Sequence, residues 1–486
     1  MKQNQSAPLR TEFAPVLDAL RQYASTYLEK LDRRPVRSST LEDDERRFDG
    51  PLPEVGAGAL AALRALIRDG EEAAIHSSGP RFFHFVMGGT TPAALGADWL
   101  ASLYDQVAYA WVSSPLALRL ELLSLDWLRE LFEIPGEWGG VMTTGATMAN
   151  FVGLAAARQW WGERQGFDVA EDGLSQRGPV PVYSSGYVHA SAVKAVGMLG
   201  MGRASVKQFS RDARGRLDLP AMERALEALD GAPAIVIGNA GEVNAGDFDP
   251  IYELASICDR YEAWLHVDGA FGLFARLSPQ SAHLAAGAER ADSITVDGHK
   301  WLNVPYDAGF AFVREKALLG RTFAYSAAYL PDPEDPRPNM GALGPESSRR
   351  ARSLAVWATL AAYGRSGHRA MVERHLALAQ HLVALVDEAP DLERLAEVPL
   401  NIVCFRYNPG GQSEADLDGL NERLGAALLE DGRVYAGTTR FEGRVALRPA
   451  IVNWRTQEGD IEELVRVVRE LGRRAAGELV PEQHPV

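Results

Sequence analysis

The stretch that decides the fold reads ADSITVDGHKWLN and covers residues 291–303. Its apolar run, residues 293–296, predicts a buried strand, and Asp297-Gly298 predicts the turn that ends it. Lys300 follows this turn and stands beside Trp301. An amine held among apolar groups is less stable as a cation, so its pKa falls and it can attack a carbonyl to form a Schiff base. The alternative is a surface lysine whose stem packs on the tryptophan.

A second strand-like run, residues 264–267, ends in Asp268 and is followed by Gly269-Ala270. A buried carboxylate is costly unless a cation or hydrogen-bond donors face it, and the two small residues would let a flat ring approach. Asp268 precedes Lys300 by 32 residues, which suits one strand–helix–strand step of a parallel sheet. Such a step would put both side chains on the rim where ligands bind. The alternative is an aspartate that only caps the next turn.

Two further segments carry polar groups at expected helix starts. Thr143-Thr144-Gly145-Ala146-Thr147 stands directly before a helix-like run, residues 148–161, and free N–H groups at a helix start suit a phosphate. Ordinary capping is the alternative, and the segment is not a Walker A loop. His189 opens another helix-like run, residues 190–199, where a structural hydrogen bond is the alternative to a ligand contact.

The rest of the chain predicts an α/β architecture with a mainly parallel central sheet. Short apolar runs at 180–183 and 234–237 alternate with helical patterns such as 221–229 and 250–261. Helical stretches are expected over 347–363 and 369–388. After residue 400, strand-like runs (402–407, 444–452) alternate with helical ones (414–429, 460–474) and predict a small C-terminal α+β domain. We expect an N-terminal helical segment over 1–76, a large domain over 77–368 and the small domain over 369–486.

Composition narrows the function classes. The 486 residues carry a formal net charge of −15, which disfavours binding to nucleic acid or to an anionic membrane surface. Only two cysteines occur, and no apolar signal-peptide core follows Met1, so a cytoplasmic protein is the expectation. We expect no metal. Six residues are lysine, so chemistry that needs an amine has few candidates: Lys2, Lys30, Lys194, Lys207, Lys300 and Lys316.

A phosphate cradle, a Schiff-base lysine, a carboxylate for a pyridinium nitrogen and a flat side chain for stacking together suit pyridoxal 5'-phosphate. With these motifs the sequence resembles the fold-type I pyridoxal-phosphate enzymes, specifically the group II amino-acid decarboxylases. The similarity runs from about Arg81 to Pro449 and includes Ser114-Pro115, His189-Ala190-Ser191 and His299-Lys300-Trp301. It implies the aspartate-aminotransferase-like fold and the decarboxylation of an L-amino acid.

The resemblance also implies residue roles. Lys300 would hold the cofactor as a Schiff base, Asp268 would pair with the ring nitrogen, and His189 and Ala270 would contact the two ring faces. The phosphate ligands would be Gly145, Ala146, Thr147 and His299. An obligate homodimer is implied, with sites at the interface and the N-terminal segment wrapped around the partner. Arg448 is a candidate for a substrate carboxylate through a bidentate contact, or for a salt bridge that fixes the small domain.

Three departures from the family pattern stand out. Asp297, expected near the cofactor, replaces the usual asparagine and would repel a phosphate. Asn244 replaces part of a threonine-rich turn and is a candidate for a polar contact to ring or substrate, whereas Glu242 has no counterpart. The family's loop tyrosine is absent from residues 336–348, although Tyr325 and Tyr329 lie earlier.

Without a proton donor at Cα, other outcomes are open. The alternatives are an aldehyde synthase, an aminotransferase or an aldol-type lyase, and a catalytically silent binding homologue.

Overall fold

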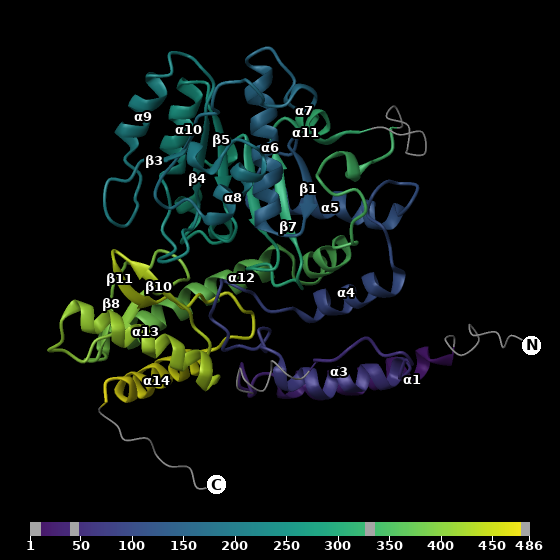
Figure 1. Cartoon of the computed structure of the whole chain (residues 1–486), viewed down its shortest axis with the longest axis vertical. Helices are drawn as coiled ribbons and strands as arrows, with labels where there is room; N and C mark the ends of the chain where they lie inside the picture. The colour runs from purple at the N-terminus through teal and green to yellow at the C-terminus, as the bar shows by residue number, and fades with distance from the viewer. Residues whose placement is uncertain (1–10, 39–47, 326–335, 478–486) are drawn as a thin grey trace, which may run out of the picture.

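The computed structural model describes residues 11–38, 48–325 and 336–477. Figure 1 shows three groups of elements: the N-terminal helices, a large group around one sheet, and a C-terminal group around a second sheet. The elements before the first strand are α1 (Phe13–Lys30), α3 (Ala59–Ala73), α4 (Pro92–Tyr104) and α5 (Pro115–Phe132). Within the described residues, no helix is long and apolar enough to cross a membrane.

The large sheet has seven strands in the order β1-β7-β6-β5-β4-β2-β3. They are β1 (Gly139–Thr143), β2 (Val182–Ser184), β3 (Val206–Gln208), β4 (Ile235–Asn239), β5 (Trp264–Asp268), β6 (Ser293–Asp297) and β7 (Gly309–Val313). The run from β3 to β6 is parallel, and β7 lies antiparallel to both β6 and β1. The predicted mainly parallel sheet is therefore confirmed. The direction of β7 could not be predicted from its short apolar sequence.

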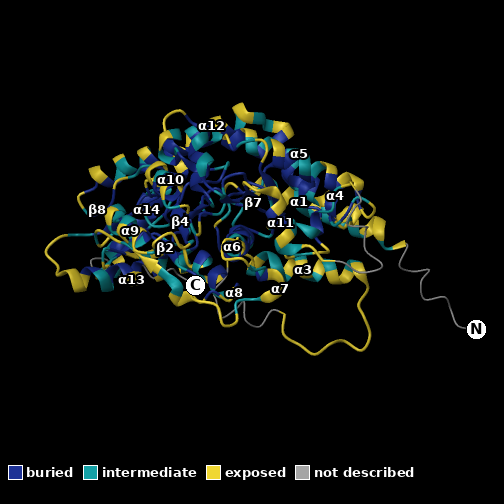
Figure 2. Cartoon of the chain, turned by 90° about the horizontal axis from the view of Figure 1, so that it is seen from above, coloured by how far each residue is buried: buried dark blue, intermediate teal, exposed yellow. Residues whose placement is uncertain are grey.

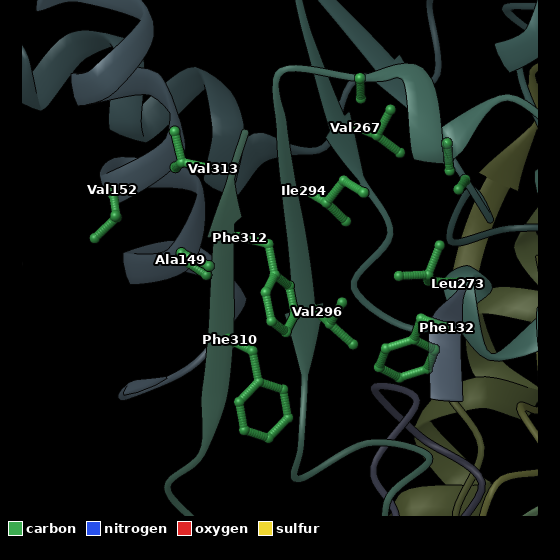
Figure 3. Close-up of a cluster of buried hydrophobic side chains, with 14 of the residues drawn as sticks. Phe132, Ala149, Val152, Val267, Leu273, Ile294, Val296, Phe310, Phe312 and Val313 are labelled. Carbon is green, nitrogen blue, oxygen red and sulfur yellow. The ribbon is translucent and has the colours of Figure 1, made fainter. Parts of the chain in front are cut away.

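Helices cover this sheet and complete its core. They are α6 (Ala146–Glu163), α7 (Val169–Asp172), α8 (Ala190–Met198), α9 (Leu219–Glu227), α10 (Ile251–Arg260) and α11 (Lys316–Phe323). Every residue of β4, β5 and β6 is buried, as strands covered on both faces require. Figure 3 shows Ala149 and Val152 of α6 on the side of β7 where Val313 lies, whereas Phe312 of β7 and Ile294 of β6 point to the opposite side, toward Leu273 and Phe132. Helix α6, which begins at the predicted phosphate turn, is thus held by the central strands.

The connection from β5 to β6 differs from the expected strand–helix–strand step. It consists of three short 3-10 segments, η3 (Gly272–Leu277), η4 (Ala282–Ala285) and η5 (Ala288–Arg290). Pro279 and Gly287 interrupt the stretch, since proline cannot continue a helix and Gly287 has a left-handed φ of +92°. The strands nevertheless pair in parallel, with Asp268 opposite Thr295. The expected outcome, Asp268 and Lys300 at one edge, does not depend on the missing helix.

A four-stranded antiparallel sheet, in the order β10-β11-β9-β8, forms the C-terminal part with its own hydrophobic core. Its elements are β8 (Leu392–Arg394), β9 (Phe405–Tyr407), α13 (Glu414–Asp431), β10 (Thr438–Phe441), β11 (Arg444–Leu447) and α14 (Glu458–Ala475). Helix α12 (Ser353–Glu388) leads into it and is kinked at Gly364, whose φ is +59°. The two helical stretches expected over 347–363 and 369–388 are confirmed as two helices that meet at this kink, the first of them beginning at Ser353, because glycine tolerates the non-helical backbone between them.

The N-terminal helices have few contacts within the chain. Helices α1 and α3 contact each other, and neither contains a buried residue. Figure 2 shows α3 and α4 at the edge of the molecule with many exposed residues. Large apolar side chains are exposed on all three helices, among them Phe13 (69%), Leu66 (59%) and Leu103 (69%).

Candidate active site

Polar residues at the carboxyl ends of the central strands surround a cavity of about 190 Å³. A water molecule takes up about 30 Å³ in the liquid, so a small organic group has room there. β4 ends at Asn239, β5 at Asp268 and β6 at Asp297, and all three residues line the cavity. Ligands of parallel sheets bind at this edge. The other lining residues are Thr144, Gly145, Ala146, Thr147, Met148, Tyr187, His189, Ser191, Gly241, Glu242, Val243, Ala270, Phe271, His299 and Lys300.

The turn between β1 and α6 has the geometry of an anion-binding site. The first N–H groups of α6, from Ala146 onward, have no partner within the helix. Gly145 precedes them with a φ of +148°, and a Cβ atom there would lie 2.8 Å from Cε1 of His299. Glycine is therefore required at this turn. The N–H of Ala146 donates to Oδ1 of Asp297 at 2.8 Å, so a carboxylate of the chain itself sits at this helix start.

Asp297 is the centre of a cluster of charged groups. The Lys300 amine lies 3.3 Å from its Oδ2, and Nε2 of His299 lies 3.2 Å from its Oδ1. Burial raises the pKa of Asp297, but Lys300, His299 and the Ala146 N–H outweigh burial and hold the pKa below its usual value. The carboxylate is thus ionised at neutral pH. The amine also lies 5.7 Å from the ring centroid of Phe271, within cation–π range.

The turn that carries Lys300 is fixed from two distant parts of the chain. Oδ1 of Asn303 accepts from the N–H groups of Gly89 (2.8 Å) and Trp454 (3.0 Å), and its Nδ2 donates to the carbonyl of Val452 at 2.9 Å. Gly88 approaches so closely that a Cβ there would lie 1.9 Å from the Lys300 carbonyl oxygen. The amine is therefore presented by a turn that is clamped between the 88–89 and 452–454 segments.

Asp268 faces the cavity opposite this turn. Its Oδ2 accepts from Nδ2 of Asn150 at 2.9 Å, and its Oδ1 accepts from the N–H of Ala270 at 3.2 Å. His189 caps α8, and its Nδ1 lies 2.7 Å from Oγ of Ser191, which orients the ring. The carboxylate, the imidazole and the Lys300 amine thus meet at one cavity, as the sequence led us to expect.

Two predicted residues are not among those that line the cavity. Asn244 donates its N–H to Glu242 at 2.8 Å, and its side-chain oxygen accepts from Oγ1 of Thr439 at 2.6 Å. Nη1 of Arg448 donates to the carbonyl of Val243, a lining residue, at 3.0 Å. Burial lowers the pKa of the Arg448 guanidinium, and the nearby Glu242 opposes that effect. Both residues therefore stand directly behind the cavity wall, where their predicted roles stay predictions.

Of the two candidates for the missing loop tyrosine, the structure describes only Tyr325. The hydroxyl of Tyr325 lies 2.5 Å from Oγ of Ser347, and Tyr325 is not a lining residue. Tyr329 lies outside the described residues.

Sequence reasoning missed several residues that the fold brings to the site. Asn150 contacts Asp268, and Tyr187, Asn239 and Phe271 line the cavity. Some signal was available, because Phe271 directly follows Ala270 and Asn239 ends an apolar run. For Tyr187 the sequence carried no such signal. Its hydroxyl donates a hydrogen bond to Asp247 at 2.6 Å.

An α/β sheet that presents a lysine amine and a carboxylate beside an anion-binding helix start is the arrangement used to hold pyridoxal phosphate. The family model described as "Pyridoxal-dependent decarboxylase conserved domain" matches residues 67–408. The chain belongs to this family.

Individual relatives agree with that assignment. The aromatic-L-amino-acid decarboxylase of Bacillus atrophaeus is 29% identical over 93% of both chains. The L-2,4-diaminobutyrate decarboxylase of Rhizobium meliloti (strain 1021) is 31% identical over 87% of this chain and 84% of its own. The crystal structure of Oryza sativa TDC with PLP and tryptamine superimposes with a TM-score of 0.88 at 25% identity, covering 98% of this chain and 99% of that one.

The protein is thus a pyridoxal-phosphate-dependent lyase that decarboxylates an amino acid. The predicted cofactor, fold class and reaction are confirmed. The relatives do not favour the aldehyde synthase, aminotransferase, aldol-type or silent alternatives.

Proposed function

We propose that the cavity at the strand ends holds pyridoxal phosphate and that Lys300 attaches it covalently. The observation that carries this proposal is the convergence of Lys300, Asp268 and the α6 start on one cavity. The chain's residues fit the cofactor: an amine for its aldehyde, a carboxylate for its ring nitrogen, and a glycine turn at a helix start for its phosphate. Gly145, Ala146, Thr147 and His299 would hold the phosphate.

The cofactor, when bound, withdraws electrons from the Cα of the substrate so that the bond to the carboxylate can break. Asp268 stabilises a proton on the ring nitrogen, because an anion beside a base favours its protonated form. His189 and Ala270 would lie against the two ring faces. Arg448 would meet the substrate carboxylate, which is supported by its position behind Val243 at the cavity wall.

We propose an aromatic L-amino acid as the first substrate class to test, on the strength of the aromatic-L-amino-acid decarboxylases among the relatives. A second candidate is diaminobutyrate. The relative with that name is 31% identical, and the buried carboxylate of Glu242 on the cavity wall would accept a side-chain ammonium.

Borohydride reduction of the holoenzyme tests the attachment site. We expect the reduced cofactor on Lys300, and only five other lysines compete in the peptide map. Lys300→Ala should abolish both labelling and carbon dioxide release, whereas the exposed Lys316→Ala should change neither. Label on another lysine would overturn the assignment.

A panel of L-amino acids, incubated with and without oxygen, identifies the substrate. The expected products are carbon dioxide and the matching amine, independent of oxygen. Absence of carbon dioxide with every aromatic amino acid and with diaminobutyrate would refute both substrate classes.

We propose that the enzyme is a homodimer whose N-terminal segment packs on the partner. Support comes from α1 and α3, which bury no residue within the chain although Phe13, Leu17 and Leu66 are apolar. Light scattering should give twice the chain mass of 52.9 kDa. Removal of residues 1–76 should shift the population to monomers, and a full-length monomer at micromolar concentration would contradict the proposal.

Two further expectations remain proposals. We propose a cytoplasmic location, supported by the two cysteines, Cys258 and Cys404, which are both buried and unpaired. The division of the chain at residues 76 and 368 is also a proposal, supported by the separate hydrophobic core of the C-terminal sheet.

A further inference from the structure

A buried chain of hydrogen bonds runs from Asp268 into the core, away from the cavity. Nδ2 of Asn150 donates to Asp268 at 2.9 Å, and Oδ1 of Asn150 lies 2.8 Å from Nε2 of His266. Nδ1 of His266 lies 2.7 Å from Oγ of Ser293, which in turn accepts from the indole N–H of Trp264 at 2.9 Å. Asn150, His266 and Ser293 are fully buried. We call Asn150, His266, Ser293 and Trp264 together the Asp268 relay.

The donor and acceptor chemistry of the relay fixes its direction. Because Nδ2 of Asn150 donates to Asp268, Oδ1 of Asn150 faces His266 and can only accept, so Nε2 of His266 carries a proton. In the neutral ring Nδ1 is then the acceptor and takes the hydroxyl hydrogen of Ser293, which itself accepts from the indole N–H of Trp264. Burial lowers the pKa of His266 to about 4, so the ring is neutral at physiological pH. Each donor in the series therefore points toward Asp268.

The opposite orientation is incompatible with an ionised Asp268. If the amide of Asn150 were flipped, its oxygen would face the carboxylate oxygen at 2.9 Å, and Asp268 would need a proton to make that contact. In the observed orientation the relay therefore presents a donor to Asp268, as an anion requires. His266 fits between α6 and β5 because residue 153 of α6 is glycine. A Cβ atom on Gly153 would lie 2.8 Å from the His266 ring.

We propose that Asn150 and His266 are positioning residues that hold Asp268 as an oriented anion for the ring nitrogen of the cofactor. The inference rests on the proposed function of the cavity. The other charged and titratable residues that line the cavity with Asp268 are His189, Lys300, Asp297, His299, Glu242 and Tyr187. From the core side, Asn150 donates to Oδ2 of Asp268. Among the described residues, this is the one side-chain hydrogen bond to that oxygen.

The test measures cofactor affinity and the visible absorption spectrum of the bound cofactor from pH 6 to pH 9. Asn150→Leu removes the donor at nearly constant volume and should weaken pyridoxal-phosphate binding by about ten- to a hundred-fold, the worth of a hydrogen bond to a charged group. Ser293→Ala, which alters the relay outside the cavity, should weaken binding by a smaller factor of about two to ten. Both variants should shift the pH dependence of the absorption spectrum.

Asn150→Asp gives a signature that a merely structural role would not produce. Two carboxylates 2.9 Å apart must share a proton, so binding should be weak at pH 9 and should recover as the pH falls toward 6. The matched control is Gln159→Leu on the same helix, because Gln159 is buried and its amide donates to Asp168 at 2.9 Å, away from the cavity. That variant should lose stability and keep wild-type affinity.

The inference fails if Asn150→Asp follows the wild-type pH profile, or if Ser293→Ala and Gln159→Leu behave alike. Its failure is distinguishable from failure of the proposed function. Borohydride label on Lys300 together with unaltered binding by Asn150→Leu would leave the function standing and remove the relay, whereas label elsewhere would remove the function itself.

Discussion

Asp297→Asn is expected to tighten the binding of pyridoxal phosphate. In the structure the Asp297 carboxylate, with only 4% of its side chain exposed, accepts from the first N–H of α6 and contacts Lys300 and His299. It therefore places a negative charge at the helix start proposed to receive a phosphate. Asparagine keeps an oxygen for the Ala146 N–H, removes the charge and adds a donor that a phosphate can accept.

The size of the effect follows from the charges. Two like unit charges 4 Å apart repel by about 4 kcal/mol at the effective dielectric constant of a protein site. Lys300, His299 and the helix dipole already compensate much of the Asp297 charge, so we expect a net gain of about 1–2 kcal/mol, or about five- to thirty-fold in affinity at pH 8. Because the pKa of Asp297 is lowered, its charge persists across this range. The phosphate loses its second proton near pH 6. Wild-type affinity should therefore fall between pH 6 and pH 8, and the variant's affinity should fall less.

The assay titrates cofactor-free protein with pyridoxal phosphate and follows absorbance and tryptophan fluorescence. Asp292→Asn is the matched control, because Asp292 stands at the opposite end of the same strand and pairs with Arg314 at 3.6 Å. That variant should bind as wild type does. If Asp297→Asn binds equally or more weakly at pH 8, then the carboxylate is not opposing the phosphate and the reasoning is refuted.

Three further predictions concern stability and the phosphate turn. Arg349→Met leaves the carboxylate of Glu121 buried without its partner, since both side chains are only 2% exposed. The free energy of unfolding, measured in urea, should fall by about 3–5 kcal/mol. The adjacent Arg350→Met breaks an exposed pair and should cost about 0–1 kcal/mol, so equal losses would contradict the account. Gly145→Ala should weaken cofactor binding by about ten-fold, through backbone strain at φ +148°, and unchanged affinity would count against a glycine-only turn. Since His266 binds its proton at about pH 4 when folded and near 6.5 when unfolded, stability should fall by about 2 kcal/mol from pH 7 to pH 5, and His266→Gln should flatten that slope.

Much of the architecture could be predicted because parallel strands leave a plain trace in sequence. The apolar runs before Asp268 and Asp297 mark buried strands, and strands of one parallel sheet end at one edge. The same rule brought Lys300 near Asp268 without knowledge of the connection between them. The prediction of a helix in that connection was wrong. Three 3-10 segments take its place, because Pro279 and Gly287 interrupt helical geometry.

The residues that escaped prediction are those whose roles depend on packing between elements. Asn150 stands among small residues of α6, and only the approach of α6 to β5 brings it to Asp268. His266 lies within the predicted strand 264–267, but its role depends on the space beside Gly153, which the sequence does not show. Asn303 is the last residue of the decisive stretch, and its hydrogen bonds reach segments more than 140 residues away, as the distance to Trp454 along the chain shows.

The kinked helix α12 belongs to both halves of the molecule, so it limits how they can move. Its first part packs on α4 and α5, and its later part contacts α14 and β8. A movement of the C-terminal sheet relative to the large sheet would have to bend α12. We expect the bend at Gly364, because the backbone there is not helical and the helix hydrogen bonds are interrupted. Because Arg448 belongs to the C-terminal part, its distance from the cavity depends on how α12 bends at Gly364.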